Sequence, residues 1–258
     1  VMDQSTDLVK AIARISYFAL APVNKVSEHE LAYWVPAWRS SDTSPARDVP
    51  AIANCLVIDS DETLRAQLLE SGLALKAIAV IPGTDIGNPD AGQLVKTLDL
   101  TREDKVAAFV DQVGEPDVVL INTAAILIDQ NNYGVAASRA LQASYIFARA
   151  LLSRTEKPLR LIVLSPTTAQ HAALAASLRG LYSTAAREFS HFSFKIIEVA
   201  IDTFKRGLVD NSLPGIIRNE LSLWNPEENY VRFTPEGNRT VRYLKEFQAQ
   251  ETHHGKIT

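Results

Sequence analysis

The stretch Cys55-Leu-Val-Ile-Asp-Ser-Asp-Glu62 decides how this sequence is interpreted. Cys55–Ile58 is a short apolar run typical of the first strand of a dinucleotide-binding fold. Acidic residues follow it instead of glycines, and the first glycine of the chain is Gly72. A Rossmann site needs glycine in the first strand-to-helix turn, because the backbone there approaches the pyrophosphate and helix N–H groups point at it. The sequence therefore predicts the body of a nucleotide-binding enzyme without its cofactor site.

Composition limits the classes of function. The chain has 258 residues, 47% apolar and 22% charged, with a net charge of −4. This acidic balance argues against binding to nucleic acid or to an anionic membrane. We expect no signal peptide and no membrane span, and a cytoplasmic location. The single cysteine, Cys55, is expected to be a small core residue and not a reactive thiol.

Short unbroken apolar runs alternate with helical patterns from residue 51 onward, which predicts an α/β fold with a parallel sheet covered by helices on both faces. About six strands are expected. The predicted strands are 53–58, 75–81, 93–98, 117–121, 159–164 and 194–201, and the predicted helices are 61–71, 102–113, 133–154 and 170–190.

The ends of the chain are predicted separately. Residues 1–45 should hold an amphipathic helix (Leu8–Leu20), an extended aromatic segment (Tyr33–Trp38) and the start of a linker at 39–50. Residues 46–205 should form the Rossmann-like domain. Residues 206–258 should hold a helix near 206–219, a β-hairpin over Asn229–Leu244 and a polar tail. The hairpin and the aromatic segment are expected to form a small antiparallel edge.

A reductase of the short-chain dehydrogenase type is the first specific hypothesis. Ile121-Asn-Thr-Ala-Ala125 ends the fourth strand, where that superfamily has an Asn-Asn-Ala-Gly stretch. Ser165 ends the fifth strand, near the position of the superfamily's catalytic serine, and Tyr182 follows in the next helix.

The lysine that this chemistry requires is missing. A catalytic tyrosine needs a lysine one helical turn later to lower its pKa. Four residues after Tyr182 stands Ala186, Arg187 lies on a different face, and no lysine occurs between Lys157 and Lys195. We therefore predict that Tyr182 packs the helix on the sheet and that Ser165 is a loop or cap residue.

Other site hypotheses are weaker. Asp59, Asp61 and Glu62 could bind a metal, but we interpret them as loop and first-turn acids that favour the positive end of a helix. His171 and His191 are expected at the ends of the 170–190 helix.

His253 and His254 lie in the polar tail, and no nucleophile elbow surrounds Ser165. Trp34, Trp38 and Trp224 are expected to pack the terminal segments onto the sheet. We therefore assign no catalytic, cofactor-binding or metal-binding residue to this chain.

Four segments together resemble a known family: Tyr33–Trp38, Ala172–Glu188, Phe194–Asp202 and Asn229–Leu244. Their order and spacing, over residues 30–248, resemble the structural subdomain of a modular polyketide synthase ketoreductase. That subdomain is a truncated, cofactor-free copy of the short-chain dehydrogenase fold, and it precedes the catalytic copy in the same polypeptide. Residues 1–30 depart from the pattern.

The resemblance implies a bracing role. The partners would be the catalytic ketoreductase copy and other domains of the same megasynthase, with NADPH and the acyl-carrier-protein substrate bound by the catalytic copy. In the family, the catalytic copy would begin just after the point at which this chain stops, Thr258. The chain therefore resembles an excised half or a pseudo-ketoreductase. Two alternatives stay open: a divergent reductase with a nonstandard site, and a stand-alone interaction module that dimerises through residues 1–30.

Overall fold

The computed structural model describes residues 33–41, 49–83, 95–127, 132–200 and 213–247. The chain divides into two compact units, one of residues 38–243 and the other of residues 1–37 and 244–258. In chain order the elements are β1 (Tyr33–Ser40), β2 (Cys55–Ile58), α2 (Thr63–Glu70), β3 (Ala77–Pro82), β4 (Val95–Leu98), α3 (Glu103–Val113), β5 (Val118–Asn122), α4 (Thr123–Ile126), α5 (Tyr133–Leu152), β6 (Leu159–Pro166), α6 (Ala169–Glu188), β7 (Phe192–Val199), α8 (Leu213–Ser222), β8 (Tyr230–Phe233) and β9 (Arg239–Phe247).

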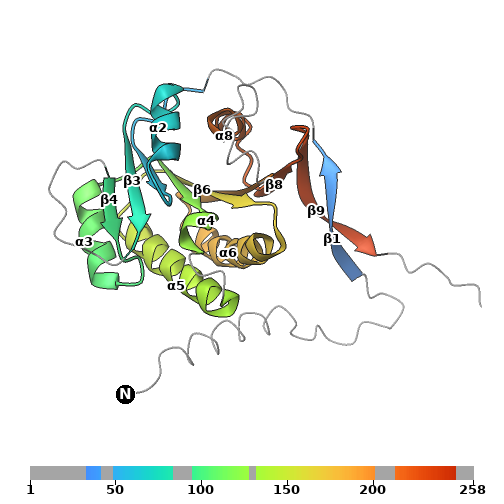
Figure 1. Cartoon of the computed structure of the whole chain (residues 1–258). Coiled ribbons are helices and arrows are strands. Elements are labelled where there is room, and N and C mark those ends of the chain that lie inside the picture. The colour runs from blue at the N-terminus through green and yellow to red at the C-terminus, as the bar shows by residue number, and fades with distance from the viewer. Residues whose placement is uncertain (1–32, 42–48, 84–94, 128–131, 201–212, 248–258) are drawn as a thin grey trace, which may run out of the picture. The chain divides into compact units, whose positions relative to one another are not determined.

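One mostly parallel sheet organises the described residues. Its strand order is β1-β9-β8-β7-β6-β5-β2-β3-β4, and β2 to β7 are the six strands that the apolar runs predicted. The predicted α/β class is confirmed, with helices on both faces of the sheet (Figure 1). The strand β8 runs parallel to β7 and antiparallel to β9, so the hairpin continues the main sheet.

The core has two layers because each central strand is buried on both faces. In β2, Leu56 and Ile58 belong to the layer under α3, α5 and α6, whereas Cys55 and Val57 belong to the layer under α2 and α8. A strand buried on both faces has no polar alternation, which explains the unbroken apolar runs. Cys55 is buried, and burial raises the pKa of its thiol to about 12, so its assignment to the core is confirmed.

The hairpin turn lies where the sequence predicted it. Thr234 N–H donates to the carbonyl of Asn238 (3.0 Å), and Gly237 N–H donates to the carbonyl of Thr234 (2.9 Å). Gly237 has a φ of 84°, in the left-handed region that favours glycine. This turn brings Arg239 back beside Phe233 at the start of β9.

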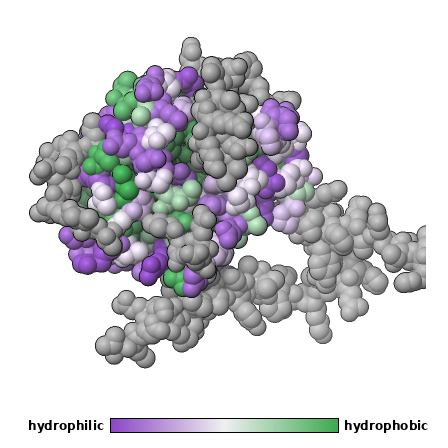
Figure 2. All heavy atoms as spheres, viewed as in Figure 1, coloured by the Kyte–Doolittle hydropathy of each residue, from purple (hydrophilic) through white to green (hydrophobic). Residues whose placement is uncertain are grey.

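Several predictions lie outside the described residues. These are the helix Leu8–Leu20, most of the linker, the first part of the 206–219 helix, and the histidines of the tail. The aromatic segment is a strand that extends to Ser40, and the helix at 206–219 is described only as α8, from Leu213. Hydrophilic residues separate small hydrophobic groups on the visible described surface (Figure 2). Among the described helices, none has the length and apolar character to cross a membrane.

Candidate functional site

Open α/β sheets bind ligands at the carboxyl ends of the strands, at the point where the strand order reverses. In this protein that point lies between β2 and β5. These two strands are neighbours, with β3 and β4 on one side and β6 and β7 on the other, so the chain reverses direction across the sheet here. The crevice at such a switch point is the usual dinucleotide site. The residues that follow β2 and β5 therefore decide whether a dinucleotide fits.

Asp59 and Asn122 bind each other at this switch point, and we call the turn closed for that reason. The pairing of Ile58 with Ile121 places them side by side, and Asn122 Nδ2 donates to Asp59 Oδ1 over 2.8 Å. The backbone N–H of Ser60 donates to the same oxygen, also at 2.8 Å. Asp59 is only 5% exposed, and burial raises the pKa of its carboxyl group, while the bonds from Ser60 and Asn122 act in the opposite direction.

The chain's own carboxylates, Asp61 and Glu62, also stand immediately before the first residue of α2. Thr63 N–H donates to Asp61 Oδ1 (2.7 Å), and Glu62 forms an ion pair with Arg65 at 3.3 Å. Free N–H groups at a helix start are what would bind a phosphate. Because this turn has no glycine and presents carboxylates, its residues do not fit a pyrophosphate.

The acids of this turn are not grouped with further metal-binding side chains among the described residues. In the ranges that the structure describes, no group of three or more His, Cys, Asp or Glu residues is arranged to hold a metal ion. Asp61 meets the helix start, as expected of a first-turn acid. Asp59 differs from that expectation, because it is buried against Asn122.

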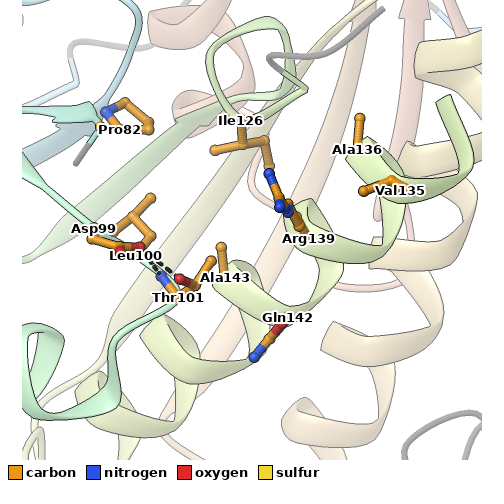
Figure 3. Close-up of a pocket in the computed structure, with 11 residues that line it drawn as sticks. Pro82, Asp99, Leu100, Thr101, Ile126, Val135, Ala136, Arg139, Gln142 and Ala143 are labelled. Carbon is orange, nitrogen blue, oxygen red and sulfur yellow. Dashed lines mark hydrogen bonds between the residues drawn. The ribbon is translucent and has the colours of Figure 1, made fainter. Parts of the chain in front are cut away.

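A cavity of about 480 Å³ lies beside the switch point, a size typical of small-molecule sites. Asp99 in its wall accepts hydrogen bonds from the N–H (2.9 Å) and hydroxyl (2.6 Å) of Thr101 (Figure 3). Sequence reasoning did not identify Arg139, which offers the cavity a cation. The lining residues are Pro82, Gly83, Asp99, Leu100, Thr101, Ile126, Val135, Ala136, Arg139, Gln142 and Ala143, and they do not include Asp59 or Asn122.

Ser165 and Tyr182 do not meet. Tyr182 is fully buried in α6 and packs on Phe194 and Phe192, with ring centroids 5.8 and 6.2 Å away. Phe192 and Phe194 pair with Leu159 and Leu161, four to six residues before Ser165 on β6. At about 3.3 Å per residue, roughly 13–20 Å of strand separates the serine from the tyrosine's surroundings. The prediction that Tyr182 is a packing residue is confirmed.

The prediction that Ser165 is a loop or cap residue is wrong. Ser165 is a fully buried residue of β6, and the pairing of Asn122 with Leu164 places it next to Thr123. The hydroxyl groups of Ser165 and Thr123 have no hydrogen-bond partner in the described part of the chain. Neither hydroxyl therefore has a base to activate it there.

The two described histidines lie at the two ends of α6. Thr168 caps the start of α6 by accepting the N–H of His171 (3.3 Å), and its hydroxyl lies 2.8 Å from His171 Nδ1. His171 is buried, and burial lowers the pKa of its imidazole. His191 precedes β7, with its ring 5.9 Å from that of Phe189. The helix-end positions are confirmed, although His171 is not at the surface.

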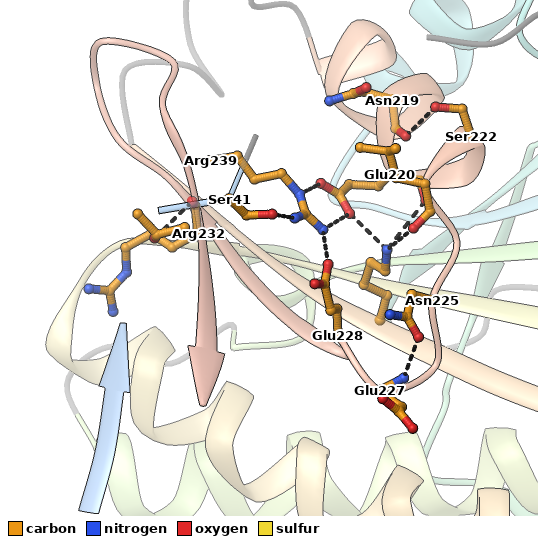
Figure 4. Close-up of polar contacts among 12 residues, drawn as sticks. Ser41, Asn219, Glu220, Ser222, Asn225, Glu227, Glu228, Arg232 and Arg239 are labelled. Atoms are coloured by element: carbon orange, nitrogen blue, oxygen red, sulfur yellow. Dashed lines mark hydrogen bonds and ion pairs between the residues drawn. The ribbon is translucent and has the colours of Figure 1, made fainter. Parts of the chain in front are cut away.

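A buried ion-pair network joins β7, α8 and β9 (Figure 4). Glu220 accepts a hydrogen bond from Lys195 Nζ at 2.8 Å and two from Arg239 at 2.6 and 3.1 Å. Arg239 also donates to Glu228 (3.0 Å) and to the hydroxyl of Ser41 (2.8 Å). The side chains of Lys195 and Glu220 have no exposed surface. The sequence contained a signal for this network, because Lys195 lies within the apolar strand predicted at 194–201, but sequence reasoning did not identify it.

A second network lies on the opposite face of β7. Buried Glu198 accepts a hydrogen bond from the Tyr230 hydroxyl and pairs with Arg232 at 2.6 Å. The ring of Trp38 lies edge-on to that of Tyr230, with centroids 5.5 Å apart. Trp224 faces Lys195 at 5.2 Å on the other side of the sheet. The predicted packing role of Trp38 and Trp224 is confirmed; the side chain of Trp34 lies outside the description.

Comparison with known proteins gives similarity in structure only. No family model and no curated protein matches the sequence. A multidomain structure of a keto acid-selecting NRPS module, with adenylation, ketoreductase and pseudo Asub domains, matches 86% of this chain at 15% identity and a TM-score of 0.65. An N-terminal ketoreductase from the macrolactin assembly line matches 95% of the chain at 14% identity and a TM-score of 0.56.

The chain spans 19% of the NRPS chain and 51% of the macrolactin ketoreductase chain. At these identities the likeness shows the fold alone. The chain therefore has a Rossmann-like fold similar to that of ketoreductase-containing assembly-line proteins.

Proposed function

We propose that this chain is a non-catalytic structural domain that braces a catalytic ketoreductase half in a polyketide synthase. The observation that carries the proposal is the closed turn after β2, where the Asp59 carboxylate, hydrogen-bonded to Asn122, lies where a dinucleotide-binding fold holds the pyrophosphate. The catalytic half would bind NADPH and reduce a β-ketoacyl group carried on acyl carrier protein. The partners would be domains of the same cytoplasmic megasynthase.

Two further observations support the proposal. Ser165 lies near the end of β6, whereas Tyr182 packs on residues that pair with the first half of β6, so the two do not form a reductase pair. The two buried networks tie the hairpin edge to β7 through Glu220 and Glu198. A rigid sheet with a closed ligand crevice suits a supporting role, since function resides in sites and not in the fold. The span of about half of the macrolactin ketoreductase chain is compatible with one half of such a protein.

The test is isothermal titration of the chain with NADPH, with an active ketoreductase as the positive control. We expect no binding heat for this chain under conditions in which the control binds. Saturable binding with micromolar affinity would overturn the proposal.

The cavity beside Arg139 favours a second candidate, a divergent reductase-like enzyme with a nonstandard site. That enzyme would bind a small, largely apolar substrate near the guanidinium group. Activity on a mixed set of carbonyl substrates that Arg139→Ala abolishes would support it. Absence of turnover with either NADPH or NADH would count against it.

A further inference from the structure

Arginines stack on aromatic rings on the α6 side of the hairpin edge. The guanidinium carbon of Arg232 lies 4.1 Å from the centre of the Trp38 ring, and that of Arg242 lies 5.1 Å from the centre of the Tyr230 ring. Arg179 of α6 approaches the same place. We call Trp38, Arg179, Tyr230, Arg232 and Arg242 the arginine face.

Two of these cations converge without a described carboxylate between them. Arg179 Nε donates to Asn229 Oδ1 over 3.1 Å, and Arg242 stacks on the next residue, Tyr230. Burial, and then the charge of Arg242, lower the pKa of Arg179. The guanidinium groups therefore repel each other in the free protein.

The nearest acid on this face is already used. Both oxygens of Glu198 are engaged, one by the Tyr230 hydroxyl and the other by Arg232. Within the described residues, neither Arg179 nor Arg242 has an ion pair with a carboxylate. Among the residues that the structure describes, no carboxylate compensates the positive charge of Arg179 and Arg242, on a chain whose net charge is −4.

The composition of the face indicates a protein partner. Tryptophan, tyrosine and arginine are the residues that contribute most to protein–protein interfaces. Arg179, Arg232 and Arg242 are half-buried at the hairpin edge and Tyr230 is buried beneath them, whereas the described cavity lies at β3, β4 and α5. A planar guanidinium group held by an aromatic ring keeps its N–H edge available for bidentate contact with a carboxylate.

We propose that the arginine face is a docking surface for an acidic segment of a protein partner, with Arg179 and Arg242 receiving its carboxylates. The inference rests on the proposed function, because a bracing domain needs a surface that holds its partner. The two can fail separately, since NADPH titration tests the closed crevice and the following experiment tests the surface.

The probe is a peptide of eight glutamates, titrated into the intact chain at about 20 mM salt while the arginine Nε–Hε NMR signals are followed. We expect saturable shifts at Arg179 and Arg242 that disappear at about 0.5 M salt. The double variant Arg179→Gln/Arg242→Gln should weaken binding by at least about tenfold, since two charge-assisted contacts are lost. The matched control, Arg149→Gln/Arg187→Gln, removes the same charge from exposed positions and should change affinity less than about twofold.

Three outcomes would overturn the proposal. They are the absence of shifts at the two arginines, an equal loss of affinity in the control variant, and tighter binding of inorganic phosphate than of the peptide at the same signals. Arg242→Lys guards against misfolding of the double variant, because it keeps the charge but loses the planar fork. It should fold and bind with intermediate affinity.

Discussion

Glu220→Gln should be among the most destabilising isosteric changes in this protein. The Glu220 side chain has no exposed surface and lies 2.8 Å from Lys195 Nζ and 2.6 Å from Arg239 Nε. The substitution keeps the volume but leaves two buried cations without their shared carboxylate. Removal of one partner from a buried ion network costs about 3–5 kcal/mol of unfolding free energy. That is a large share of the roughly 5–15 kcal/mol that stabilises a folded protein.

Urea denaturation followed by circular dichroism measures this effect. With an m-value of about 2–3 kcal/mol/M, the midpoint should fall by about 1–2 M. The control is Arg149→Gln, which breaks the exposed Arg149–Glu103 pair and should change stability by less than about 0.5 kcal/mol. Replacing Lys195, Glu220 and Arg239 together with Met, Leu and Leu should restore most of the loss, because the only charge left without its partner is then Glu228, whose side chain is partly exposed. A cost below about 1 kcal/mol for Glu220→Gln would refute the reasoning.

Three other residues give independent predictions. Burial raises the pKa of Asp59 in the folded protein above its value in the unfolded chain, which is about 3.9. As the pH rises above that value, ionisation of Asp59 therefore lowers the stability of the folded protein. Asp59→Asn should be more stable than wild type at pH 7, and the difference should vanish in acid. An equal difference at pH 3 in urea melts would contradict this. Tyr182→Phe removes a buried hydroxyl without a well-formed hydrogen bond in the described chain, so calorimetry should show no loss, or a gain of up to about 1 kcal/mol. A larger loss would indicate a partner for that hydroxyl. The Cys55 thiol, with its pKa raised to about 12, should react with a disulfide reagent only after denaturation. Rapid labelling of the native protein would show that the sheet opens locally at β2.

The parallel body could be predicted from sequence because strands buried on both faces give unbroken apolar runs. Cys55–Ile58 and Val118–Asn122 are examples. The place of β8 could not be predicted. Its pairing with β7 is long-range, so local alternation identified a hairpin but not the strand beside which it lies. Ser165 was misplaced because the Pro166 that follows it suggests the end of a strand, whereas β6 continues to Pro166.

The site could be predicted only in part, for the same physical reason. The missing glycines and the acidic turn were evident, but the bond between Asp59 and Asn122 joins residues 63 positions apart. It depends on the register between β2 and β5, which local patterns do not contain. Lys195 and Glu198 are charges in an apolar strand that the sequence analysis did not single out, and their partners come from α8, β8 and β9.

The most direct test of the closed turn follows the side-chain amide of Asn122 and the backbone N–H of Ser60 by NMR during addition of NADPH. Both groups donate to Asp59 Oδ1, so both report on any group that displaces this carboxylate. A structural domain with a closed crevice predicts that neither signal moves at millimolar NADPH. Saturable shifts of both signals would show that the crevice opens to the cofactor, and would contradict the central claim.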